Sequence, residues 1–134
     1  MGLPGVLRAA LAGVCIIHGL PKLTNLSMYA EMLPISFTAT LFVALAELSG
    51  GVLILIGGLG ASKEFDLVTR AGAALNILVM FGAIRMVYRA RWNFVPSESH
   101  PMGGMQFQVT LLLILVFFVL VGNDRRDDRF TQAI

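Results

Sequence analysis

The chain has 134 residues, of which 57% are hydrophobic and only 13% are charged, and its mean hydropathy is +0.81. Soluble globular proteins carry about 25% charged residues, so this composition excludes an ordinary soluble fold and indicates a single membrane domain. The net charge of +2 is too small to indicate a nucleic-acid partner, and one cysteine excludes both a disulfide within the chain and a thiolate metal cage.

The first apolar segment predicts a transmembrane helix over residues 3–23. A basic residue followed by an apolar run is also typical of a signal peptide, but no small-residue cleavage site follows. We therefore expect an uncleaved membrane helix. At about 100° per residue, its ionisable side chains fall within one narrow arc. These side chains are Arg8, Cys15, His18 and Lys22.

The second predicted transmembrane helix covers residues 37–59 and carries one acid, Glu47, near its middle. A carboxylate at that depth costs about 2.5–3.5 kcal/mol on insertion scales unless a partner offsets it. Ala46 and Gly50 flank the acid, so we expect this face to pack against another helix, away from lipid. The preceding connector, residues 25–36, can lie in the membrane interface as a short amphipathic helix.

A polar turn at residues 60–66 precedes the third predicted helix, residues 67–88. A loop rich in Pro, Gly and Ser over residues 93–104 leads to the fourth helix, residues 105–121, which is almost entirely aliphatic and aromatic. Residues 123–134 form a charged tail that we expect to be solvated.

The predicted fold is an all-α membrane protein, an antiparallel bundle of four transmembrane helices within residues 1–122. Four spans place both termini and the 60–66 turn on the same side, together with six of the ten lysines and arginines. The positive-inside rule then favours cytoplasmic termini in a bacterial inner membrane.

Polar residues from all four predicted helices are expected to meet. With a rise of about 1.5 Å per residue, His18 lies about 6 Å, and Lys22 about 12 Å, from the middle of the first helix on the non-cytoplasmic side. Arg85 lies about 10 Å from the middle of the third helix on that side, where Gln106 also opens the fourth. Together with Glu47, these residues predict a polar ladder from the membrane midplane to the outer surface.

The ladder has two interpretations, and the residues leave both open. A buried acid paired with a base can lock helices in register, although polar contacts between membrane helices average only about 0.6 kcal/mol. Alternatively, the ladder lines a pocket for a small polar-headed ligand such as a quinone. Glu47 or His18 would then exchange protons, while Arg85 or Lys22 would hold an oxygen. No metal is expected at His18, because the other histidine lies in a loop.

Short motifs follow one another along the chain. His-Gly-Leu-Pro-Lys occupies residues 18–22, Glu-Leu-Ser-Gly-Gly residues 47–51, Gly-Gly-Leu residues 57–59, and Gly-Gly-Met-Gln residues 103–106. Four single residues accompany them: Arg8, Gly13, Trp92 and Gly122. In this order and spacing the motifs resemble the DoxX family of small bacterial and archaeal four-helix membrane proteins.

The resemblance implies a quinone-linked redox role, with Glu47, His18, Lys22 and Arg85 as candidate site residues. Some relatives resemble the membrane subunit of thiosulfate:quinone oxidoreductase, and others act with partner enzymes in oxidative-stress complexes. The chain has no haem, iron–sulfur or flavin motif, so we expect it to be non-catalytic alone and the redox centre to lie on a partner oxidoreductase.

Two other functional classes compete with this one. The alternative is a structural accessory subunit of a larger membrane complex, with no ligand chemistry of its own. A small transporter is less favoured, because a ladder confined to half of the membrane makes no through-path unless the chain forms a homo-oligomer.

Overall fold

The computed structural model describes residues 3–88, 91–98 and 103–123. Within these ranges the chain forms five α-helices and no β-strand, which confirms the predicted all-α class. The helices are α1 (Leu3–Thr24), α2 (Leu26–Met32), α3 (Phe37–Gly57), α4 (Lys63–Met86) and α5 (Gln106–Val121).

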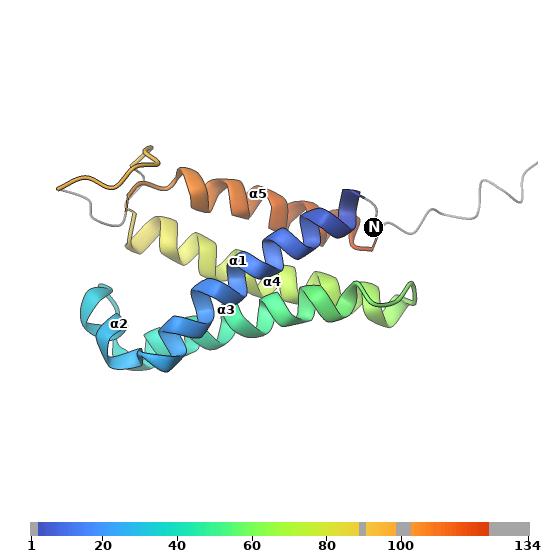
Figure 1. Ribbon diagram of the computed structural model, residues 1–134, viewed down its shortest axis with the longest axis horizontal. Helices are drawn as coiled ribbons and strands as arrows, with labels where there is room; N and C mark the ends of the chain where they lie inside the picture. The colour runs from blue at the N-terminus through green and yellow to red at the C-terminus, as the bar shows by residue number, and fades with distance from the viewer. Residues whose placement is uncertain (1–2, 89–90, 99–102, 124–134) are drawn as a thin grey trace, which may run out of the picture.

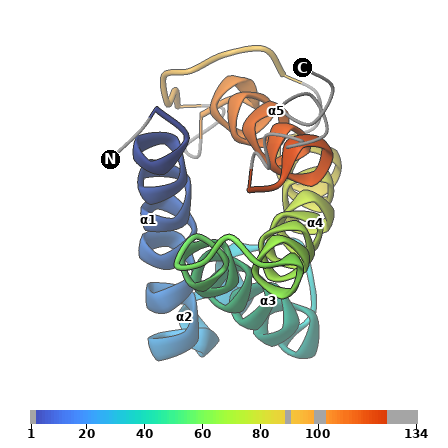
Figure 2. The ribbon, with the colours of Figure 1, turned by 90° about the vertical axis from the view of Figure 1, so that its right-hand side faces the viewer.

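The four long helices run alternately up and down the long axis of the molecule, and the short α2 lies at the end where α1 passes to α3 (Figure 1). Packing follows chain order: α1 lies along α3, α3 along α4, and α4 along α5, whereas α1 and α5 make few contacts. Viewed from the end, the helices form an arc that is open between α1 and α5 (Figure 2). The bundle therefore has one weakly closed seam.

Three helical segments are long and apolar enough to cross a membrane: Gly5–Thr24, Phe37–Gly57 and Lys63–Met86. The fourth predicted span forms α5, a strongly apolar helix of 16 residues. Its length is about 24 Å, which is shorter than the roughly 30 Å of a hydrocarbon core. By length and composition, the described residues thus contain three spanning segments and one shorter apolar helix.

Capping and charge determine where α3 and α4 begin. α3 begins as expected, because the Ser36 side chain accepts a hydrogen bond from the Ala39 N–H at 3.2 Å. α4 begins at Lys63, earlier than expected, and its first turn carries Glu64 and Asp66, whose charges favour a helix N-terminus. The polar turn predicted at 60–66 is correspondingly shorter.

Small residues let α3 approach its neighbours closely. A Cβ atom on Gly72 of α4 would lie 2.7 Å from the carbonyl oxygen of Gly50, and a Cβ atom on Gly51 would lie 3.0 Å from the Cβ atom of Cys15 on α1. Gly50 and Gly51 are buried, as is Glu47 on the same helix. This confirms the predicted packing of the small-residue face beside Glu47 against other helices.

Candidate functional site

A cavity of about 640 Å³ occupies the end of the bundle where α1 and α4 end and α3 and α5 begin. All five helices contribute to its walls, which are mostly aliphatic. Its volume falls within the roughly 300–1,000 Å³ of typical small-molecule sites. Few of the lining residues are polar: His18, Lys22, Tyr29, Glu47, Tyr88 and Gln108.

An ion pair lies in the wall of this cavity. Lys22 Nζ of α1 contacts Glu47 Oε2 of α3, and the Lys22 and Glu47 side chains are 15% and 4% exposed. Gly19 makes the approach close, since a Cβ there would lie 2.8 Å from the Leu48 backbone nitrogen. A buried carboxylate requires a compensating partner, and Lys22 supplies it.

Glu47 keeps unused hydrogen-bonding capacity at the cavity. Only Oε2 takes part in a hydrogen bond among the described residues, and Lys22 is the donor. A carboxylate offers about four lone-pair sites on two oxygens, and an ammonium has three N–H donors. The pair can therefore stay intact and still bind a further polar group.

His18 lines the cavity from α1 and is exposed, unlike the buried Glu47. Its ring contacts Phe107 of α5, with centroids 6.1 Å apart and planes inclined by 41°. This contact bridges the weakly closed seam between α1 and α5.

Tyr88, which lines the cavity beyond the end of α4, is also affected by this environment. Burial and, to a smaller degree, the Glu47 charge raise the pKa of the Tyr88 phenol.

The other two residues suggested by the sequence do not line the cavity. Arg85 is exposed on α4, and Gln106 is half-buried in the first turn of α5. Gln108 of α5 lines the cavity instead, with 9% of its surface exposed and no hydrogen-bond partner for Oε1 among the described residues. Two residues along a helix turn it by about 200°, so Gln106 and Gln108 lie on nearly opposite faces.

Sequence reasoning missed Gln108, because α5 is apolar all round and its sequence does not distinguish the inward face. Gln108 shares one helical stripe with Leu111, Leu115 and Phe118, at spacings of three, four and three residues, and all four residues are buried. This spacing marks the inward face of a helix. Gln106 falls outside the stripe.

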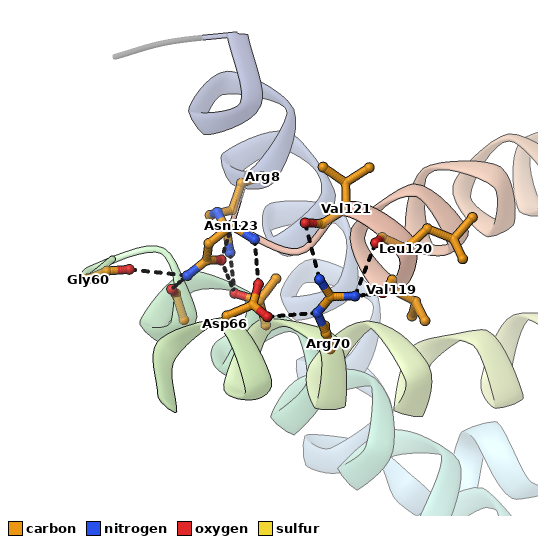
Figure 3. A network of polar contacts seen from close by, with 10 residues as sticks. Arg8, Gly60, Asp66, Arg70, Val119, Leu120, Val121 and Asn123 are labelled. Carbon is orange, nitrogen blue, oxygen red and sulfur yellow. Dashed lines mark hydrogen bonds and ion pairs between the residues drawn. The ribbon is translucent and has the colours of Figure 1, made fainter. Parts of the chain in front are cut away.

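A second polar cluster lies at the opposite end of the bundle and is formed by Arg8, Asp66, Thr69, Arg70 and Asn123; we call it the terminal clamp. Figure 3 shows Arg8, Asp66, Arg70 and Asn123 gathered there. Arg8 donates to Thr69 Oγ1 and to Asn123 Oδ1, each at 2.8 Å. Arg70 Nε donates to Asp66 Oδ2 at 2.8 Å, and Asp66 Oδ1 accepts from the Asn123 N–H at 2.8 Å. The clamp therefore joins the end of α5 to α1 and α4.

The clamp also binds carbonyl groups that helix ends leave without partners. Asn123 Nδ2 donates to Gly57 O at 2.6 Å, and Arg70 donates to the carbonyls of Val119, Leu120 and Val121 at the end of α5. Asn123 thus belongs to the bundle, whereas the sequence placed it in the charged tail; residues 124–134 lie outside the described part of the chain. These contacts indicate a structural cluster.

In the described ranges, no group of three or more His, Cys, Asp or Glu side chains is placed to hold a metal ion. Comparisons with family models, curated proteins and solved structures gave no match. The functional argument therefore rests on the cavity, its polar groups and the sequence motifs.

Proposed function

We propose that this chain is a DoxX-like membrane protein of the bacterial inner membrane that binds a quinone and supports a partner oxidoreductase. The observation that carries the proposal is a cavity of about 640 Å³ with mostly aliphatic walls that reaches the partly buried Lys22–Glu47 ion pair. A quinone combines an apolar ring and tail with two carbonyl oxygens. An apolar pocket with a few placed polar groups suits such a molecule.

The proposed membrane arrangement is a four-helix antiparallel bundle in which α5 completes the three longer spans. Trp92, Phe94 and Val95, which precede α5, are 62–65% exposed and add apolar surface at the cavity end. Aromatic residues of this kind favour the membrane interface, and a short span is tolerated at modest cost. Cytoplasmic termini follow from the distribution of Lys and Arg, and they place the cavity in the outer half of the bilayer.

Within the cavity, the proposed roles follow from the chemistry of each group. Lys22 keeps N–H donors beyond the one that Glu47 accepts, and these can bind a quinone oxygen. Glu47 and His18 are the groups that can exchange protons with the bound ligand. Arg85 and Gln106 do not line the cavity and have no part in this proposal.

The electron-transfer centre is assigned to a partner protein, because the sequence contains no haem, iron–sulfur or flavin motif. The role of this chain would be to hold the quinone and manage its protons within the membrane. A chain of this kind acts only as part of a complex with the enzyme that carries the redox centre.

A structural accessory subunit is the second candidate, and one observation favours it: Glu47 has a cationic partner without any ligand. Such a subunit needs a dry, close-packed bundle around the pair. The cavity that reaches Glu47 and Lys22 favours ligand binding instead.

Co-purification tests the proposal. The full chain, purified in mild detergent, would be extracted and its bound quinones and partner proteins identified, alongside Ala83→Phe and Ala74→Phe variants. Ala83 lines the cavity, whereas Ala74 is exposed on the same helix and does not line it. We expect quinone with the wild type and Ala74→Phe but not with Ala83→Phe. Equal quinone content in all three preparations would indicate bulk lipid and contradict the proposal.

A further inference from the structure

Gln108 contributes to the cavity wall a buried side-chain oxygen that no described residue pairs. Gln108 is 9% exposed and lines the cavity, and its Oε1 accepts no hydrogen bond from any described residue. Buried side-chain oxygens in native structures are nearly always paired, and an unpaired one calls for a specific explanation. The position of Gln108 in a cavity wall makes a ligand donor the most direct explanation.

The polar groups of the cavity differ in what they offer. Lys22 supplies only donors, whereas the free oxygen of Glu47 supplies only an acceptor. Gln108 Oε1 adds a second acceptor, held on the inward face of α5 among apolar neighbours. The site therefore presents acceptors that a ligand without an O–H or N–H group cannot satisfy.

We propose that the cavity selects the reduced, hydroxyl-bearing quinol over the quinone, with Gln108 Oε1 accepting a hydrogen bond from a quinol hydroxyl. This inference rests on the proposed quinone site. A quinone carbonyl can only accept, so beside Gln108 Oε1 it opposes one oxygen to another; it can take a hydrogen bond from the Gln108 amino group but leaves Oε1 unpaired. A quinol hydroxyl donates to Gln108.

Lys22 does not discriminate between the two forms. Its ammonium can donate both to a carbonyl oxygen and to a hydroxyl oxygen. We therefore assign the discrimination to the acceptors, and Gln108 Oε1 is a buried acceptor in the cavity wall that no described residue pairs, whereas the Glu47 carboxylate is already paired with Lys22. Sites built to pair a ligand hydroxyl reject analogues that lack it, because the buried polar group is then left unsatisfied.

The chain offers a matched control for this role. Gln106 is the same residue type on the same helix, and it does not line the cavity. Gln108→Leu removes the acceptor with little change in volume, whereas Gln106→Leu makes the same chemical change outside the cavity. Each variant is compared with the wild type in the full chain.

The test is calorimetric titration of purified protein in lipid nanodiscs, under anaerobic conditions, with a decyl-tailed benzoquinone and separately with its two-electron-reduced quinol. We expect the wild type to bind the quinol about ten-fold more tightly, the fold-change expected from satisfying one buried acceptor. Gln108→Leu should bring the two affinities together by weakening quinol binding alone. Gln106→Leu should keep the wild-type ratio.

The outcomes separate this inference from the proposal on which it rests. Binding of both forms to the wild type with equal affinity would overturn the preference and leave the quinone site standing. Retention of the preference in Gln108→Leu would overturn the role of Gln108. If neither form binds, the proposed function fails as well. The wild-type ratio decides the preference even if Gln108→Leu does not fold.

Discussion

Lys22 of α1 forms an ion pair with Glu47 of α3 in the wall of the cavity, so a neighbouring helix neutralises the acid in the middle of the long apolar segment. The pair leaves one Glu47 oxygen and two of the ammonium protons free of described hydrogen bonds. Its arrangement is compatible with a structural contact and with a ligand contact, and substitutions can separate the two.

Removal of the cation alone should destabilise the bundle. In Lys22→Met, the Glu47 carboxylate, in a residue only 3% exposed, loses its one described partner. We expect a loss of about 2.5–3.5 kcal/mol, the cost of an uncompensated acid at this depth. Reversible unfolding in bicelles measures it. Lys63→Met, at the exposed start of α4, is the control and should change stability little; equal losses in both variants would contradict the structural importance of the pair.

The close approach of α3 and α4 predicts opposite effects of one substitution at two glycines. Gly72→Ala places a Cβ atom 2.7 Å from Gly50 O and 2.8 Å from Leu53 Cβ, so the helices must separate, at a cost of about 1–3 kcal/mol. Gly13→Ala meets nothing within 4 Å and should stabilise α1 by up to about 1 kcal/mol through helix propensity. Thermal unfolding of both variants tests this. A Gly72→Ala protein as stable as Gly13→Ala would show that the interface is looser than described.

The terminal clamp predicts that Asn123→Ala loosens the end of α5. The substitution removes an acceptor for Arg8 and a donor to Gly57 O, and it leaves both without that partner. We expect a loss of about 1–3 kcal/mol, together with faster amide exchange in the last turn of α5. Asn25→Ala, at an exposed position after α1, is the control. Unchanged exchange at residues 119–122 would show that the clamp does not hold this end.

The sequence predicted the helical class, and the levels of His18 and Lys22 along α1, better than it predicted which residues of α4 and α5 face inward. Depth along a helix follows from counting residues, and this placed His18 and Lys22 near the level at which they line the cavity with Glu47. Rotation about the axis is harder to predict, because α5 is apolar all round and offers little contrast between its faces. The prediction therefore chose Gln106, while the structure places Gln108 in the cavity wall.

Two other differences concern Arg85 and Asn123. Arg85 lies at the expected level of α4, but it is exposed on the surface of the bundle. Asn123 reads as the first residue of a charged tail, yet Gly122, with φ of 65°, turns the backbone so that Asn123 reaches Gly57 O and Asp66. A Cβ atom on Gly122 would overlap the Asp66 carboxylate, so the turn requires glycine. Such long-range contacts leave no periodic pattern in a sequence.

The most direct test of the central claim is quinone binding by the double variant Lys22→Met/Glu47→Leu, measured by calorimetric titration in nanodiscs with unfolding stability recorded in parallel. Replacing both members of a buried ion pair with apolar residues of similar volume is often neutral or stabilising. We expect the double variant to fold with wild-type stability and to bind the decyl-tailed quinone at least about ten-fold more weakly, through loss of the charged donor. Wild-type affinity in a stably folded double variant would contradict the claim that this pair holds the ligand.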